Sequence, residues 1–79
     1  MVVDYVAGTG NYSYTFSGNS LRPPQRVEFS NDGAADAVLT INGLAITVKG
    51  GETLSESFSA FTTAAISGTP GAWRLLLAR

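Results

Sequence analysis

Apolar and polar residues alternate most regularly over residues 37–48, AVLTINGLAITV, on both sides of an Asn-Gly pair. Asn-Gly is the preferred pair for a two-residue type I′ turn, because both central residues of that turn need a positive φ. A turn at Asn42 and Gly43 therefore predicts a β-hairpin with one wholly apolar face. The predicted cross-strand pairs are Ile41 with Leu44, Leu39 with Ile46 and Ala37 with Val48 on the apolar face, and Thr40 with Ala45, Val38 with Thr47 and the charge pair Asp36 with Lys49 on the other.

Shorter segments with the same two-residue period fill the rest of the chain, separated by glycine, proline and asparagine. In residues 52–58, Glu56 shares a face with Leu54 and Phe58, which predicts an edge strand or a bulge. About eight short strands and no helical period predict an all-β fold, a single domain over residues 1–79 built as a small antiparallel β-sandwich or jelly roll. The further strands are expected in VVDYV (2–6), NYSYTFS (11–17), QRVEFS (25–30), ETLSESF (52–58), TAAIS (63–67) and AWRLLLA (72–78).

The composition indicates that this domain needs support from other chains. A chain of 79 residues buries only about 60–65% of its unfolded surface, and without cysteine it has no disulfides. Charged residues make up 14% of the chain, against about 25% in ordinary soluble domains. We therefore expect oligomerisation or burial in a larger assembly. The net charge of −1 argues against a nucleic-acid partner, and no apolar run approaches a membrane span.

No pattern typical of an active site or a cofactor site is present. Without histidine and cysteine, the ordinary catalytic triad and the usual zinc and iron–sulfur ligand sets are missing. The glycines of residues 8–18, GTGNYSYTFSG, lack the lysine of a phosphate loop, and we expect a hairpin turn there. The sequence thus predicts no enzyme activity, no cofactor and no metal requirement. Turn and surface positions, rather than an acid–base pair or a metal site, account for the carboxylates of Asp32, Asp36, Glu52 and Glu56.

The aromatic residues offer an alternative function. Exposed rings of Tyr5, Tyr12 and Trp73 would form a platform for sugar rings, as expected of a carbohydrate-binding module. The favoured interpretation places these large rings in the core, because aromatic residues supply much of the burial in a small domain. Tyr12, Tyr14 and Phe16 share one face of their predicted strand, and Trp73 lies on the inward face of the last one.

The last predicted strand has apolar residues on both faces. A strand of this kind is normally buried on both faces. In so small a domain, we expect a neighbouring subunit to bury the second face. The inward face consists of Trp73, Leu75 and Leu77, and the predicted assembly interface consists of Arg74, Leu76 and Ala78.

The N-terminal sequence MVVDYVAGTGNY has no basic region and only a short apolar run broken by Asp4, so we expect no signal peptide. The low charge and the many small polar residues nevertheless resemble those of an extracellular protein. A virion component released by cell lysis fits this combination, and so does a domain of a longer export substrate. Met1 favours a complete chain.

Four short motifs lie in residues 27–67: Asn-x-Gly at 31–33, Ile-Asn-Gly at 41–43, Gly-Glu at 51–52 and Phe-x-x-Phe at 58–61. In these motifs, about half of the chain resembles small β-sandwich modules of bacteriophage virion accessory proteins, such as head fibres, decoration proteins and tail-tip domains. The resemblance implies trimeric or higher symmetric assembly and no enzyme activity. It implies no particular functional residue.

The sequence therefore favours a non-enzymatic virion structural protein, located in the virion, that acts by homo-oligomeric assembly, with a trimer as the expected stoichiometry, and by docking onto other virion proteins. The alternative is a carbohydrate-binding module that recognises a cell-surface glycan. Coplanar exposed rings would favour the alternative, and an apolar symmetric interface would favour assembly. Head and tail locations both stay open.

Overall fold

The computed structural model describes residues 2–16 and 23–79. It confirms the predicted all-β class, with eight strands and no helix among the described residues. The strands are β1 (Val2–Thr9), β2 (Tyr12–Thr15), β3 (Arg26–Asn31), β4 (Ala37–Ile41), β5 (Leu44–Val48), β6 (Thr53–Ser57), β7 (Thr63–Ser67) and β8 (Ala72–Ala78).

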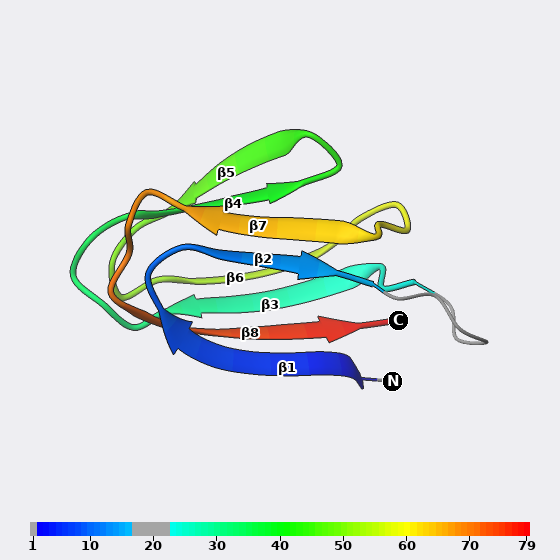
Figure 1. Cartoon of the computed structure of the whole chain (residues 1–79), viewed down its shortest axis with the longest axis horizontal. Coiled ribbons are helices and arrows are strands. Elements are labelled where there is room, and N and C mark those ends of the chain that lie inside the picture. The colour runs from blue at the N-terminus through cyan, green and yellow to red at the C-terminus, as the bar shows by residue number, and fades with distance from the viewer. Residues whose placement is uncertain (1, 17–22) are drawn as a thin grey trace.

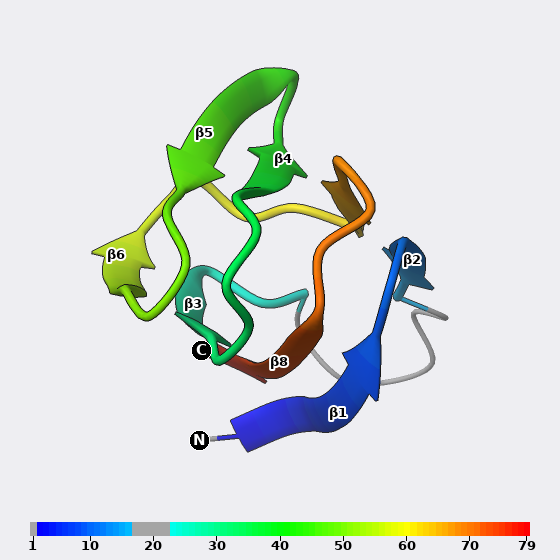
Figure 2. The same cartoon turned by 90° about the vertical axis from the view of Figure 1, so that its left-hand side faces the viewer.

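Two antiparallel four-stranded sheets form the sandwich (Figures 1 and 2). Sheet A has the strand order β1-β8-β3-β6, and sheet B has the order β2-β7-β4-β5. The antiparallel pairs are nested around the β4–β5 hairpin: β3 with β6, β2 with β7 and β1 with β8. This nesting is the topology of a jelly roll. It leaves β1 and β2 at one side of the sandwich and β5 and β6 at the other, as the end-on view shows (Figure 2).

The core fills the space between the two sheets. Alternate residues of each strand point inward, as the two-residue period predicts. Val27 and Phe29 on β3 are fully buried, and so are Leu75 and Leu77 on β8. The buried cluster consists of Tyr14, Val27, Phe29, Ala37, Leu39, Ile41, Val48, Phe61, Ala64, Ile66, Trp73, Leu75 and Leu77.

The β4–β5 hairpin forms at the predicted turn and in the predicted register. Asn42 and Gly43 have φ values of 53° and 76°, as a type I′ turn requires. All five predicted pairs between Ala37–Ile41 and Leu44–Val48 are present. The predicted pair of Asp36 with Lys49 is wrong as an ion pair, because the ion pairs found among the described residues join Arg26 to Glu28 and Arg74 to Asp32.

The turn gives a first testable prediction. Replacing Gly43 with valine places a β-branched residue at φ 76°, and we expect the free energy of unfolding to fall by more than about 1 kcal/mol. Urea denaturation measures the change. An unchanged midpoint would contradict the role of this turn in setting the register.

The first strand differs from the sequence prediction in its length and in its partner. β1 continues through Gly8 to Thr9, and Gly8 lies against the indole ring of Trp73. The hairpin predicted for residues 8–18 is wrong over the described part, because β1 pairs with β8 and β2 pairs with β7. Residues 17 and 18 lie outside the described residues. The backbone N–H of Gly10 donates to Pro70 O at 3.1 Å, which directs the chain from one sheet to the other.

A buried asparagine joins the loops at one end of the sandwich. The side chain of Asn31, at the end of β3, is 1% exposed. Its Nδ2 donates to Ala35 O at 2.8 Å and to Val48 O at 2.9 Å, and its Oδ1 accepts from Gly33 N at 3.2 Å. Its backbone N–H donates to Glu52 O, and its carbonyl accepts from Gly51 N. One residue therefore connects the β3–β4 and β5–β6 loops through five hydrogen bonds.

Candidate interaction surface

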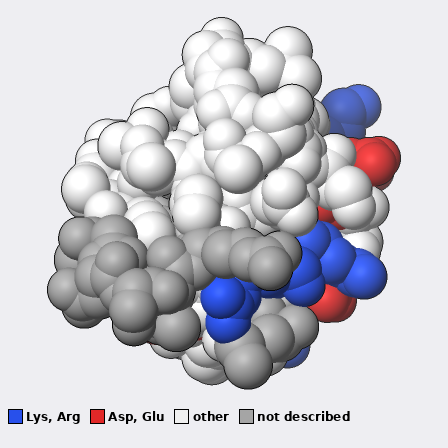
Figure 3. Space-filling model, turned by 90° about the vertical axis from the view of Figure 1, so that its right-hand side faces the viewer, with Lys and Arg blue, Asp and Glu red and all other residues white. Residues whose placement is uncertain are grey.

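The outer faces of the two sheets differ in charge. No strand of sheet B contains a charged residue, whereas every strand of sheet A contains at least one. Figure 3 shows the end of the sandwich that carries the β4–β5 turn: the blue and red groups lie in the lower part and along the right-hand side, and the top is white. Charge therefore distinguishes sheet A as the face on which ion pairs can orient a partner.

An apolar area lies on the outer face of sheet A, where β1 runs beside β8. Tyr5 is directly opposite Leu76, and Val2 is directly opposite Ala78, so the four side chains lie on the face away from the core. We call these four residues the outer patch. Val2 and Tyr5 are 56% and 54% exposed. Leu76 is half-buried and Ala78 is buried, so β1 supplies most of the exposed apolar surface.

Two ion pairs lie beside the outer patch on the same face. Arg74 donates from Nε to Asp32 Oδ2 at 2.8 Å and from Nη2 to Oδ1 at 3.1 Å, a two-pronged contact. Arg26 Nη2 lies 3.6 Å from Glu28 Oε2, and Glu28 is the neighbour of Leu76 on β3. The hydrogen bonds from Arg74 lower the pKa of the Asp32 carboxyl below its ordinary value of 3.8. The outer patch thus has a polar border.

The Asp32–Arg74 pair predicts a particular acid titration. Because the pKa of Asp32 is lowered by folding, its stabilising contribution is complete above the unfolded value and is lost as the pH falls through the folded pKa. We expect the carboxyl resonance of Asp32 to titrate with a midpoint below 3.8 in NMR spectra. In Arg74→Gln the midpoint should rise. Equal midpoints in the two proteins would show that the ion pair is absent in solution.

The predicted assembly residues Arg74, Leu76 and Ala78 all lie on the outer face of sheet A. The cross-strand pairs place Arg74 between Ala7 and Ser30, and Leu76 between Tyr5 and Glu28. Leu76 is already half covered within one chain. The sequence did not identify Val2 and Tyr5 as part of this face, because the pairing of β1 with β8 joins the two ends of the chain.

The rings proposed for glycan binding do not come together. Trp73 is 2% exposed, and its Nε1 donates to Gly10 O at 2.9 Å. Tyr12 packs against it inside the sandwich, with ring centroids 5.3 Å apart and planes tilted by 47°. Tyr5 lies on the opposite face of sheet A. A sugar platform needs exposed rings in one plane, which this arrangement does not provide; Trp73 and Tyr12 belong to the core.

The carboxylates singled out in the sequence are dispersed among the described residues. Asp32 pairs with Arg74, and Glu52 Oε1 accepts from the backbone N–H of Lys49 at 3.2 Å, closing the turn between β5 and β6. Within residues 2–16 and 23–79, no group of three or more acidic, histidine or cysteine side chains could hold a metal ion. The same part of the chain has no helix that is long and apolar enough to cross a membrane.

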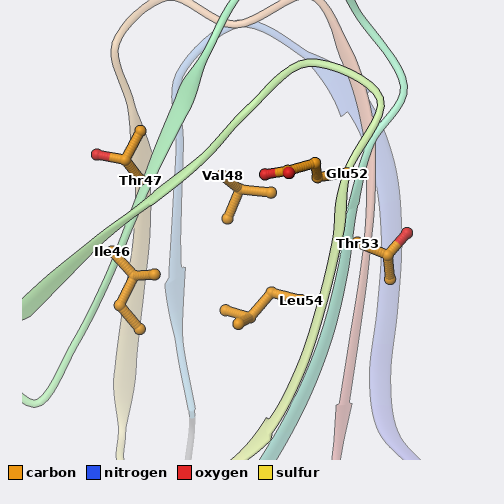
Figure 4. A pocket seen from close by; sticks show the side chains of 6 residues that line it. All are labelled: Ile46, Thr47, Val48, Glu52, Thr53 and Leu54. Carbon is orange, nitrogen blue, oxygen red and sulfur yellow. The ribbon is translucent and has the colours of Figure 1, made fainter.

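A groove lined by both apolar and polar side chains runs along the other side of the sandwich, and it was not predicted from the sequence. It has a volume of about 300 Å³ and opens between the edge strands β5 and β6. Ile46, Val48 and Leu54 point into it together with the carboxylate of Glu52, whereas Thr47 and Thr53 point away (Figure 4). Because Leu54 and Glu56 share a face, the sequence indicated that residues 52–58 form an edge strand. It did not indicate that β5 would lie opposite this strand. We call this feature the edge groove.

The fold is a jelly-roll β-sandwich, with the outer patch on the side of β1 and the edge groove on the side of β5 and β6. Neither protein-family models nor curated proteins give a match to this chain.

Proposed function

We propose that the chain is a non-enzymatic structural protein that acts by self-assembly and by docking onto other proteins. The outer patch carries this proposal. Val2 and Tyr5 remain more than half exposed beside Leu76 on a face bordered by ion pairs. Removal of such side chains from water stabilises an association by about 1.5–3 kcal/mol for each fully buried residue.

A symmetric homo-oligomer, with a trimer as the proposed stoichiometry, would repeat this contact in every subunit. The size of the chain supports the proposal, because small domains bury a small fraction of their surface and gain stability from their neighbours. A virion as the setting, with other virion proteins as docking partners, is proposed on the resemblance of residues 27–67 to phage accessory modules.

The decisive experiment is sedimentation of the wild-type protein and of Leu76→Asp. We expect a wild-type oligomer at micromolar concentration and a monomeric variant, because an aspartate at position 76 would place a charge among apolar side chains in the interface. Far-ultraviolet circular dichroism of the variant should keep much of its β-signal.

Thr63→Asp is the matched control, since Thr63 is exposed on the outer face of sheet B and receives the same charge. This variant should sediment like the wild type. A monodisperse wild-type monomer at micromolar concentration would overturn the self-assembly proposal.

A further inference from the structure

The edge groove lies beside β5, which among the described residues lacks the usual features that protect an edge strand from further pairing. β5 has no proline, no charged residue and an uninterrupted register with β4. By contrast, β1 has a register shift between Val2 and Asp4 and carries that aspartate within the strand. Bulges and charged residues are the usual means by which proteins protect an edge strand. β5 is therefore an edge strand of sheet B that is open to another strand.

The hairpin register identifies the free backbone groups of β5. In a two-residue hairpin, the residues that flank the turn form a hydrogen-bonded pair, and such pairs recur at every second position. Leu44, Ile46 and Val48 therefore bond to β4. The N–H and C=O groups of Ala45 and Thr47 consequently point away from β4, toward the open edge.

The side chains that β5 presents to the edge groove and to its open edge are apolar. Leu44 occupies an inward-facing position but is 56% exposed, and Ile46 is only half-buried. Leu54 of β6 faces Ile46 across the edge groove and is also half-buried. An inward-pointing side chain of an added strand would lie among these three residues and exclude water from them.

The β6 side of the edge groove carries negative charge. Glu52 and Glu56 lie two residues before and two residues after Leu54, and both are exposed. The alternation of a strand places Leu54 and Glu56 on one face, and Glu52 also lines the groove. Among the described residues, the side chain of Glu56 has no hydrogen-bonding or ion-pair partner. A charged partner would therefore meet two carboxylates with an apolar side chain between them.

The negative charge of Glu52 and Glu56 discriminates between the chains that could add a strand beside β5. A second copy that paired through its own β5 would form an isologous contact, which brings the carboxylates of both grooves into one interface. A second copy that added β1 would bring Asp4, the only charged residue of that strand. Like charges oppose both arrangements, whereas basic side chains would be complementary.

We propose that the edge groove binds an extended segment of another protein in which basic, apolar and basic residues occupy alternate positions. The segment adds to sheet B as a strand beside β5, with hydrogen bonds to the backbone of Ala45 and Thr47. Its apolar side chain lies between Ile46 and Leu54, and its basic side chains reach Glu52 and Glu56. This mode of recognition is β-strand addition, in which the backbone supplies affinity and alternate side chains supply specificity. It does not depend on self-assembly through the outer patch.

The test is an NMR titration of the full chain with a short acetylated peptide in which arginine, leucine and arginine alternate with threonine. We expect saturable shifts of the amides of β5 and slower hydrogen exchange at Ala45 and Thr47. Glu56→Gln should weaken binding about two- to fivefold, the range of an exposed ion pair. Glu28→Gln is the matched control, because it removes the same charge from the outer face of sheet A, and it should leave the affinity unchanged.

Variants of the peptide and of the edge complete the design. Thr47→Pro removes an outward N–H at a position where an edge strand tolerates proline, and binding should be lost while the core amide resonances are kept. Should that variant unfold, a peptide with proline in its centre tests the same hydrogen bonds on the wild-type protein. Equal binding of a peptide with glutamate in place of arginine would overturn the proposal. So would protection of the β5 amides that rises with protein concentration in the absence of peptide, because it would show that a second copy of the chain pairs with β5.

Discussion

Replacing Trp73 with alanine should lower the free energy of unfolding by about 3–5 kcal/mol, the usual cost of removing a large aromatic side chain from a core. The indole is 2% exposed and packs against Tyr12 and Phe29, with ring centroids 5.3 and 6.3 Å away. Its loss also leaves Gly10 O without the donor at 2.9 Å. For a domain of this size, whose total stability is about 4–12 kcal/mol, much of the protein would unfold.

Tyr5→Ala is the control for this experiment, because Tyr5 is an aromatic residue on the other face of sheet A. As a 54% exposed side chain, it should change the stability of the folded chain by less than about 1 kcal/mol. Urea denaturation of both variants, measured where their association states match, provides the comparison. A larger loss for Tyr5→Ala than for Trp73→Ala would contradict the assignment of Trp73 to the core and restore it as a candidate sugar-binding ring.

Asn31→Asp should destabilise the fold almost as much as Trp73→Ala, although asparagine and aspartate have almost the same shape. The substitution replaces the Nδ2 donor to Ala35 O and Val48 O with an oxygen that both carbonyls repel. A buried polar group without a partner costs about 1–3 kcal/mol, and a charged one costs more. We therefore expect the free energy of unfolding to fall by about 3 kcal/mol or more at neutral pH.

The pH dependence of the stability of Asn31→Asp distinguishes the effect of the introduced charge from the effect of side-chain shape. Burial beside two carbonyls should raise the pKa of the introduced carboxyl above its unfolded value, because it disfavours the charged form. A group with a raised folded pKa is best tolerated at low pH, so the loss relative to the wild type should shrink as the pH falls.

Asn42→Asp is the matched control for Asn31→Asp, since Asn42 is exposed, its Nδ2 donates only to Ser59 O at 3.1 Å, and Asp-Gly also suits the turn. We expect a loss below about 1 kcal/mol, with no recovery in acid. Equal losses for the two aspartate variants in urea denaturation would contradict the role of Asn31 in joining the loops.

The inward and outward faces of most strands could be predicted from the sequence. The turn at Asn42 and Gly43 and the inward positions of Val27 and Phe29 follow from neighbours in the chain, because turn chemistry and the two-residue period are local properties. The same reasoning placed Leu76 on the face away from the core.

The partners of the strands, and with them both candidate surfaces, were decided by the tertiary structure. The sequence by itself determined that β8 carries apolar residues on both faces, but only the pairing of β1 with β8 joins Tyr5 to Leu76 in one patch. It likewise determined that Leu54 and Glu56 share a face. The nesting of the jelly roll set β6 opposite β5 and left Leu44 half uncovered, because contacts between residues far apart in the chain depend on how the sheets close and not on any local pattern.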